Sequence, residues 1–400
     1  MFRIGKEEID AVARVIESKN LFKINDAMHE TEQCEELMRE KFGVKRALLV
    51  TSGMGALASA LIGMGIGPGD EVIVPAYTYI ATAMAVVAAG AVPVIVDIDE
   101  TYTMSAEKAA EKINPRTKCI IPVHIQGFPC AMDEIKKLAD ENGIMILEDA
   151  CQADGGSYKG KRLGAIGNAG ALSFNQFKII TAGEGGALIT NDDKIYERAL
   201  IYHDSSAIAF FGDQLKDVTE PQFCGTEFRT NEISAAILHQ QLLKLDDILF
   251  DLRKNKRALT ELIGNVCRIS PSNDIEGDCG TTLPVVFKDE QSARQFSASI
   301  GVGNYLPIDT GKHIYDHWTA ILEKRGAFRP EMDPFRFPEN ADHLPDYKNE
   351  RYPVTLDLLA RTVFILVDPD WTDNNIDEIS QGIIKAAKGL SHLAKNEKNK

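Results

Sequence analysis

The strongest constraint on the fold is the alternation of short apolar runs with helical patterns through the first half of the chain. The runs rich in Val, Ile or Leu are residues 47–51, 71–75, 92–97, 119–124 and 144–149. Helical patterns lie between them, at residues 56–64, 81–89, 106–112 and 132–141. Continuous apolar strands separated by helices must be covered on both faces. This order therefore predicts an α/β fold in which a mostly parallel sheet lies between two layers of helices.

Two further apolar runs, residues 171–174 and 187–190, are expected to be strands on either side of a loop that contains Lys178. His124 and Asp149 each stand at the end of a predicted strand. In open α/β sheets, the groups that bind ligands gather at the carboxyl ends of the strands. We therefore expect the functional site where these strand ends meet the Lys178 loop.

The second half of the chain predicts a smaller α+β unit joined to the first by one long helix. Apolar residues recur at helical spacing from residue 231 to about 262. Further strand-like and helical patterns lie at residues 281–287, 292–300, 363–367 and 374–390. We expect a large domain over residues 1–250, a small C-terminal domain over residues 251–400, a proline-rich loop at 328–353 and a frayed polar tail at 395–400.

Composition narrows the possible partners and location. The formal net charge of −15 is spread along the chain, which argues against nucleic acid and anionic membranes because both require a basic face. The seven cysteines are an odd number without CxxC spacing, so reduced thiols are expected. We see no signal peptide, no run as long as a membrane span and no metal-ligand spacing, and so expect a cytoplasmic protein without a metal.

Lys178 lies between Phe177 and the pair Ile179-Ile180, which predicts that its side chain is buried. Burying an unpaired ammonium is unfavourable, so a buried lysine gives up its proton more readily and becomes a nucleophile. Asp149 arrives from the end of an apolar strand, where a carboxylate could keep a pyridine nitrogen protonated. An amine that can bond an aldehyde, together with such a carboxylate, is what pyridoxal phosphate chemistry requires.

Other residues could complete a cofactor site of this kind. The turn Thr51-Ser-Gly-Met-Gly55 joins a strand to a helix, and backbone N–H groups at such a turn can approach a phosphate. Ser173 is a second candidate phosphate ligand. Tyr79 could stack on the pyridine ring, and Gln152 could hydrogen-bond the cofactor's phenolic oxygen.

These motifs, in this order, resemble the DegT/DnrJ/EryC1/StrS family of sugar aminotransferases, which has an aspartate-aminotransferase-like fold. The resemblance rests on residues 51–57 (TSGMGAL), 67–75 (GPGDEVIVP), 78–82 (TYIAT), 122–127 (PVHIQG), 148–152 (EDACQ), Ser173-Phe with Lys178, and 183–186 (GEGG). It extends from about residue 5 to the C-terminus and is densest before about residue 250.

The resemblance implies a fold type I homodimer with shared active sites, with glutamate as amino donor and a keto sugar as acceptor. Pyridoxal phosphate would be bound to Lys178, which would also move the proton during the reaction. The implied cofactor contacts are Asp149 at the pyridine nitrogen, Gln152 at the phenolic oxygen, Tyr79 on the ring face, and Gly53, Met54 and Ser173 at the phosphate. Relatives that dehydrate sugars carry a histidine at the Lys178 position, so the lysine favours a transaminase.

Three places depart from the family pattern. Met54 and Gly55 stand where Thr-Ala is usual, which removes a hydroxyl ligand. Glu227 replaces the asparagine that reaches the partner subunit's phosphate, and its charge would repel that phosphate unless it points elsewhere. Asp154 stands where a neutral or imidazole side chain is more usual. Arg229 is retained and could receive a carboxylate.

The identity of the acceptor stays open at this point. It could be a C8-oxidised 3-deoxy-manno-octulosonate, a free acid sugar of lipopolysaccharide, or a nucleotide-linked 4-keto or 3-keto sugar. The candidates for substrate contact are Arg229, Glu227, His124 and His313, and further cations for an acid sugar are Lys159, Arg162 and Lys312. His124 and His203 could equally be structural.

Three other functions are compatible with parts of this pattern. The first is another pyridoxal phosphate reaction on the same fold, such as that of a lyase or a decarboxylase. A regulatory protein without turnover is a second, and the presence of Lys178, Asp149 and Gln152 argues against it. A reductase that binds NAD is the third, and it would require a glycine spacing that is missing from the phosphate loop.

Overall fold

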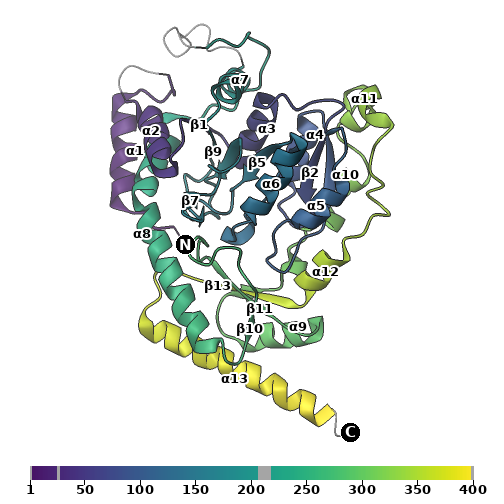
Figure 1. Cartoon of the computed structure of the whole chain (residues 1–400). Helices are drawn as coiled ribbons and strands as arrows, with labels where there is room; N and C mark the ends of the chain where they lie inside the picture. Colours follow the sequence, from purple (N-terminus) through teal and green to yellow (C-terminus); the bar gives the residue numbers. More distant parts are fainter. Residues whose placement is uncertain (1, 25–27, 206–217, 398–400) are drawn as a thin grey trace.

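The computed structural model describes residues 2–24, 28–205 and 218–397. Its main feature is a seven-stranded sheet with the order β1-β9-β8-β5-β4-β2-β3 (Figure 1). The strands are β1 (Arg46–Val50), β2 (Glu71–Pro75), β3 (Val92–Val96), β4 (Thr117–Ile120), β5 (Met145–Asp149), β8 (Ala169–Ser173) and β9 (Gly186–Thr190). Neighbouring strands are parallel except where β9 pairs antiparallel with β1 and β8. The predicted mostly parallel α/β sheet is confirmed.

Alternate side chains of the strands enter two separate apolar cores, one on each face of the sheet. Leu49 belongs to the first core and Leu48 to the second, because successive side chains of a strand point to opposite faces. The first core is covered by α2 (Glu30–Phe42), α5 (Ala106–Lys112), α6 (Met132–Asn142) and α8 (Glu232–Ile263), and the second by α3 (Gly53–Gly63), α4 (Ala81–Ala88) and α7 (Asp193–His203). Helices thus cover both faces (Figure 1).

A second, four-stranded sheet with the order β10-β11-β13-β12 is reached through the long helix α8 (Figure 1). Its antiparallel strands and the helices around it are β10 (Arg268–Ile269), β11 (Thr282–Val286), β12 (Asn304–Tyr305), β13 (Thr362–Leu366), α9 (Glu290–Ser299) and α13 (Asp373–Glu397). Residue 250, the boundary predicted between two domains, lies within α8. The N-terminal helix α1 (Lys6–Ser18) packs against α8 through Ala11 and Val15.

Helix α13 continues to Glu397, so the frayed tail predicted from residue 395 is wrong for residues 395–397. Residues 398–400 of that prediction lie outside the described part of the chain. No helix within the described ranges is long and apolar enough to cross a membrane.

Strand β4 ends at Ile120 rather than at residue 124, where the apolar run ends. Pro122 has no N–H with which to continue the ladder, and the chain turns into a short 3₁₀ helix, Ile125–Gly127. Within it Gln126 has a φ of 52°, a left-handed conformation that is uncommon for a residue with a side chain. The turn places Gln126 at the carboxyl end of the sheet.

The segment between β12 and β13 consists of short helical turns joined by irregular chain, so the predicted loop at 328–353 is partly helical. The turns are Pro307–Thr310, Tyr315–His317, α10 (Thr319–Leu322), Pro330–Met332, Pro334–Arg336, α11 (Pro338–Ala341) and α12 (Pro353–Ala360). Backbone N–H groups of Thr78 and Ile80 donate to the carbonyls of His313 and Lys312 at 2.9 and 3.0 Å. This pairing brings the C-terminal half of the chain to the end of β2.

Candidate active site

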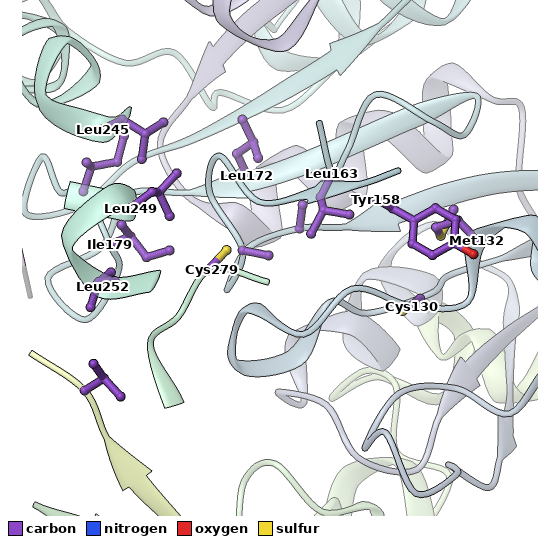
Figure 2. Packing of buried hydrophobic residues seen from close by; sticks show 14 of the residues in the cluster. Cys130, Met132, Tyr158, Leu163, Leu172, Ile179, Leu245, Leu249, Leu252 and Cys279 are labelled. Atoms are coloured by element: carbon purple, nitrogen blue, oxygen red, sulfur yellow. The ribbon is translucent and has the colours of Figure 1, made fainter. Parts of the chain in front are cut away.

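Lys178 lies in the loop between β8 and β9. Asn175 fixes this loop, because its Oδ1 accepts from the Phe177 N–H at 2.9 Å and its carbonyl accepts from the Lys178 N–H at 3.1 Å. Ile179 is buried and lies beside Leu249 of α8 (Figure 2). Phe177 instead points outward and is 82% exposed, so the prediction that it helps to bury Lys178 is wrong. The lysine is half-buried, anchored on one side only.

A cavity of about 170 Å³ adjoins the Lys178 side chain. Its polar lining includes Gln126, Gln152, Thr281 and His313. The structure thus brings together Lys178, Gln152 and His313, three residues that the sequence singled out. Within the described residues, no hydrogen bond or ion pair engages the Lys178 amine. Burial and the charges of Lys312 and Lys178 lower the pKa of His313 to about 4, so its ring is neutral at physiological pH.

Tyr79 lies beside this cavity with 41% of its surface exposed. The centroid of its ring is 5.4 Å from that of His313, and the Lys312 Nζ lies 5.3 Å from the same ring. Tyr79 follows β2, whereas His313 and Lys312 come from the segment paired with it. One wall of the site is therefore assembled from residues far apart in the sequence.

The carboxylate of Asp149, at the end of β5, accepts two hydrogen bonds from the part of the chain that the structure describes. Its Oδ2 accepts from the Thr82 Oγ1 at 2.7 Å, and its Oδ1 accepts from the Cys151 N–H at 3.1 Å. The Thr82 hydroxyl also contacts the Thr78 hydroxyl at 2.7 Å. Because the proton of Thr82 is committed to the carboxylate, Thr78 must be the donor in that second bond. The relay from Thr78 through Thr82 therefore supports a negative charge on Asp149.

The turn after β1 has the close packing that a phosphate-binding turn requires. Ser52 caps α3, its Oγ accepting from the Gly55 N–H at 3.0 Å, and Met54 is half-buried in the first turn of the helix. A Cβ on Gly53 would lie 2.8 Å from the Cys151 Sγ and 2.9 Å from the Ser173 Cβ. The helix N-terminus thus approaches β8 and the end of β5 as closely as its backbone allows, with the Ser173 side chain buried beside it.

Gln126 is a residue of this site that the sequence did not reveal. Its backbone N–H donates to the Gln152 Oε1 at 3.2 Å, so the amide nitrogen of Gln152 is left free to donate elsewhere. Gln126 is itself held by Thr281, whose hydroxyl donates to its carbonyl at 2.6 Å, and by Thr282, whose hydroxyl donates to its Oε1 at 3.3 Å. The feature that marks Gln126 as unusual is its positive φ, and a backbone angle cannot be read from a sequence.

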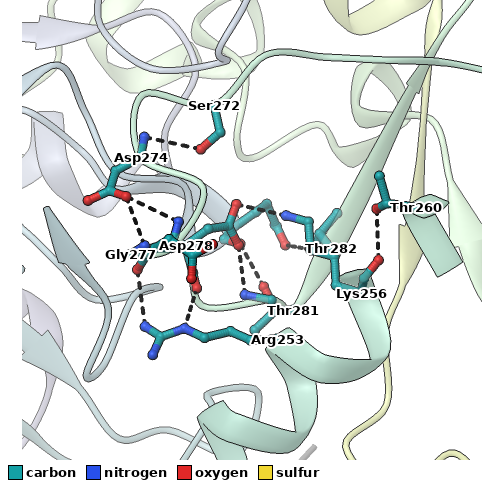
Figure 3. A network of polar contacts seen from close by, with 12 residues as sticks. Arg253, Lys256, Thr260, Ser272, Asp274, Gly277, Asp278, Thr281 and Thr282 are labelled. Atoms are coloured by element: carbon teal, nitrogen blue, oxygen red, sulfur yellow. Dashed lines mark hydrogen bonds and ion pairs between the residues drawn. The ribbon is translucent and has the colours of Figure 1, made fainter. Parts of the chain in front are cut away.

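The two threonines are in turn anchored to α8 by the network in Figure 3. The Arg253 Nε donates to the Asp278 carbonyl at 2.7 Å, and the Lys256 Nζ lies 2.7 Å from the Asp278 carboxylate. Asp278 also accepts from the Gly280 N–H at 2.7 Å. The start of β11 therefore has a fixed position, from which it orients Gln126 and Gln152.

His124 is fully buried, and both of its ring nitrogens have partners. The Cys130 N–H donates to its Nδ1 at 3.1 Å, so the Nε2–H is free to donate to Glu148 at 3.0 Å. Glu148 also accepts three backbone N–H groups from residues 164–167 at 2.6–2.9 Å. His203 is buried as well, its pKa lowered well below the usual value by desolvation, and its Nδ1 donates to the Leu200 carbonyl at 2.7 Å.

Arg229 and Glu227 lie away from the cavity. Arg229 forms ion pairs with Asp204 and, at 2.6 Å, with Glu227, so the charge of Glu227 is compensated within the chain. The Arg229–Val50 bridge places this segment beside the end of β1. Two other candidate cations are also occupied, since Lys159 pairs with Asp133 and Arg162 pairs with Asp246.

A larger cavity of about 330 Å³ adjoins Gly280 and Leu283. Its walls include Tyr102 and Phe128, and its cations Arg253 and Lys256 are those bonded to Asp278. It contains no residue that the sequence connects with chemistry. No group of three or more metal-ligating side chains occurs within residues 2–24, 28–205 and 218–397.

The groups around Lys178 suit pyridoxal phosphate one by one. An unpaired amine can bond its aldehyde, a hydrogen-bonded carboxylate can hold its ring nitrogen, and a tightly packed helix N-terminus can receive its phosphate. Carried on a mostly parallel sheet covered on both faces, they define the class of protein as a fold type I transferase that uses this cofactor.

Comparisons with known proteins give the family. A model of the DegT/DnrJ/EryC1/StrS aminotransferase family matches residues 3–300, and the chain belongs to this family. The spore coat polysaccharide biosynthesis protein SpsC of Bacillus subtilis is 31% identical, with 96% of each chain aligned. The GDP-perosamine synthase of Caulobacter vibrioides is 41% identical over 54% of this chain and 57% of its own length.

An aminotransferase structure from Psychrobacter cryohalolentis superimposes with a TM-score of 0.79 and 28% identity, covering 97% of this chain and 98% of the other. The predicted family, fold type, enzyme class and cofactor are thereby confirmed: the chain is a pyridoxal phosphate-dependent aminotransferase.

Proposed function

We propose that the chain transfers an amino group from glutamate to a keto or aldehydo carbon of a sugar. The observation that carries this proposal is the unpaired amine of Lys178 in the cavity that it shares with Gln152 and His313. When bound, pyridoxal phosphate supplies the electron sink that lets a proton leave the carbon beside the transferred nitrogen. The protein must then hold the cofactor, move that proton and accept two substrates in turn.

Lys178 would act twice. It would first hold the cofactor, and once displaced by the amino donor it would take the proton from the donor's carbon and return it one position away. A single amine can do both because the freed side chain stays within reach of the proton that it moves. Asp149, kept negative by Thr82 and the Cys151 N–H, would hold the ring nitrogen in its protonated form.

The phosphate would be bound by backbone N–H groups of Gly53 and Met54 at the start of α3, where the helix dipole favours negative charge. Ser173 would add a hydroxyl from β8, and it compensates in part for the hydroxyl lost at Met54. Gln152 would donate its free amide N–H to the phenolic oxygen, and Tyr79 would cover the ring face. We assign His124 a structural role, because it has no surface open to a ligand.

Two acceptors are worth testing. A nucleotide-linked 4-keto or 3-keto sugar is supported by the GDP-perosamine synthase among the relatives, and SpsC suggests a place in surface-polysaccharide biosynthesis. The C8-oxidised octulosonate, an acid sugar, would require a cation at the site. Arg229, Lys159 and Arg162 are occupied by acidic partners, so this acceptor depends on Lys312 beside Tyr79.

We also propose that a second copy of the chain completes the site. Phe177 is 82% exposed immediately beside Lys178, and an aromatic ring so placed is expected to be covered in the assembled enzyme. The predicted cytoplasmic location and the two-domain division at residue 250 remain proposals as well. Light scattering on the purified protein would give the mass of a monomer or a dimer.

The direct test of the reaction uses glutamate carrying ¹⁵N and a panel of keto sugars, with mass spectrometry of the products. We expect ¹⁵N in one class of amino sugar and none in the Lys178→Ala variant. Label in a nucleotide-linked amino sugar alone would support the first acceptor, and label in an octulosonate alone the second. A protein that binds the cofactor but labels no sugar would refute the proposed function.

A further inference from the structure

Asp154 is a carboxyl group that the reaction described above does not use. It is completely buried, and neither of its carboxylate oxygens has a hydrogen-bond partner within the described residues. A buried carboxylate without partners is strongly disfavoured, whereas the protonated acid is far less costly to bury. Desolvation accordingly raises the pKa of Asp154 well above the ordinary value, with the Lys178 amine and the Ser173 N–H opposing the rise and Asp149 adding to it.

The surrounding loop prevents Asp154 from reaching solvent. A Cβ on Gly155 would lie 2.7 Å from a methyl group of Leu249, and one on Gly156 would lie 2.7 Å from the Cys279 Sγ. Arg162 also donates to the Gly155 carbonyl. The loop is thus packed between α8 and the start of β11, and the carboxyl group must stay where it is.

Other titratable groups face Asp154, and they differ in how their charge is balanced. Asp149 is stabilised as a carboxylate by Thr82 and the Cys151 N–H. The Cys151 and Cys279 thiols have raised pKa values because of burial, so both stay neutral. The cation that acts on Asp154 is the amine of Lys178, and no ion pair joins the two within the described residues.

These environments divide the roles of the two carboxyl groups. Asp149 has two hydrogen-bond donors and can stay charged beside a protonated ring nitrogen. For Asp154 the nearby cation is the Lys178 amine, whose charge is variable. Protonation of the Lys178 amine would stabilise the ionised form of Asp154 relative to the neutral acid. Such pairs of carboxyl groups in unlike environments are a common basis for assigning acid and base roles.

We propose that Asp154 is a positioning residue that balances the charge of the Lys178 amine: it is a carboxylic acid while the amine is neutral and a carboxylate while the amine is protonated. The inference deepens the proposed function and rests on it, since it assigns Asp154 a role through the amine that moves the proton. In the state with a neutral amine the carboxyl group holds the proton, and in the charged state the amine holds it. The pair keeps one proton and no net charge in both states.

The first test uses the protein without cofactor and does not depend on activity. Asp154→Asn removes the titration and keeps the shape. The comparison is made in the Lys178→Ala background, where no amine can share the proton. As pH rises above about 4, the unfolded Lys178→Ala chain releases the Asp154 proton while the folded chain keeps it, so folding becomes progressively less favourable. We therefore expect urea midpoints of Lys178→Ala/Asp154→Asn to rise relative to Lys178→Ala between pH 4.5 and 8. With Lys178 present the same comparison should change little with pH, because the pair holds one proton in the folded and the unfolded chain. A difference that does not change with pH in the Lys178→Ala background would overturn the proposal.

A matched control is Asp97→Asn, because Asp97 is also buried but accepts from the Thr355 N–H at 2.7 Å and from the Val354 N–H at 3.3 Å. That change removes an acceptor from paired donors and should lower stability throughout the same range. If Asp154→Asn fails to fold, Asp154→Ser provides the same comparison with a smaller neutral group.

The second test concerns the link to Lys178. In the protein loaded with pyridoxal phosphate, the pH midpoint of the change in visible absorbance should fall by about one to two pH units in Asp154→Asn, the usual size of the shift when a nearby opposite charge is lost. It should not move in Asp97→Asn. A midpoint unchanged in Asp154→Asn would overturn the coupling even if the stability test succeeds. A wild-type protein that transfers no amine would instead refute the proposed function and leave the stability comparison intact.

Discussion

Thr82→Val should remove a hydrogen bond to the Asp149 carboxylate, and the structure allows the resulting loss of stability to be estimated. Thr82 is fully buried, and its hydroxyl donates to the Asp149 Oδ2 at 2.7 Å. Valine keeps the volume and branching of threonine and removes this donor, so that among the described residues the Cys151 N–H is the donor left to the carboxylate. A hydrogen bond to a charged group contributes about 1.5–3 kcal/mol, so we expect a loss of that size in the free energy of unfolding of the protein without cofactor.

Thr78→Val is the matched control, because it removes the hydroxyl that bonds Thr82 and leaves the bond from Thr82 to Asp149 in place. Thr78 donates to the Thr82 hydroxyl and does not touch the carboxylate, so its removal should cost about 0.5–1.5 kcal/mol, as for a bond between neutral groups. Urea unfolding of both variants and of Thr82→Ser, which restores the donor, measures the difference. Equal losses in Thr82→Val and Thr78→Val, or no loss in Thr82→Val, would show that the hydroxyl of Thr82 does not support Asp149.

Three further changes test other parts of the site. Gly53→Ala should weaken pyridoxal phosphate binding at least about tenfold in equilibrium dialysis, since its Cβ would lie 2.8 Å from the Cys151 Sγ, whereas Gly55→Ala, with its nearest atoms at 3.4 Å, should bind nearly normally. His313→Gln should reduce acid sensitivity. The folded-state pKa of His313 is depressed from 6.5 to about 4, so the stability it contributes is complete above pH 6.5 and is lost as pH falls towards 4, by at most about 3 kcal/mol; urea midpoints across that range in the variant should fall less than in wild type. Thr282→Val removes the hydroxyl that donates to the Gln126 Oε1, and should raise KM or lower kcat while leaving the larger sheet intact. Unchanged kinetics would show that this hydrogen bond to Gln126 has no part in the reaction.

The sequence predicted the sheet well because its signals are local. Strand β2 and helix α5 have the predicted bounds, since apolar runs and helical spacing depend on neighbouring residues. Motifs near strand ends also brought Lys178 and Gln152 to one cavity, as expected because the carboxyl ends of parallel strands meet at one edge of the sheet. His313 reaches the same cavity by another route, through the pairing of its segment with the residues after β2.

What the sequence could not provide depends on contacts between distant segments. Gln126 joins the site through Thr281 and Thr282, more than a hundred residues away in the chain. The outward turn of Phe177 was missed because its apolar character does not fix the direction of a side chain in a loop. The ion pairs of Arg229 and the isolation of Asp154 likewise depend on which groups the fold happens to place beside them.

The central claim is that Lys178 carries the cofactor and moves the proton. Borohydride reduction of the loaded protein fixes the bond between the cofactor and its lysine, and peptide mass spectrometry then locates the modified residue. We expect the label on Lys178, with none in Lys178→Ala, and we expect glutamate added before reduction to prevent the labelling. Label on another lysine, such as Lys312 beside Tyr79, or labelling that glutamate does not change, would contradict the assignment.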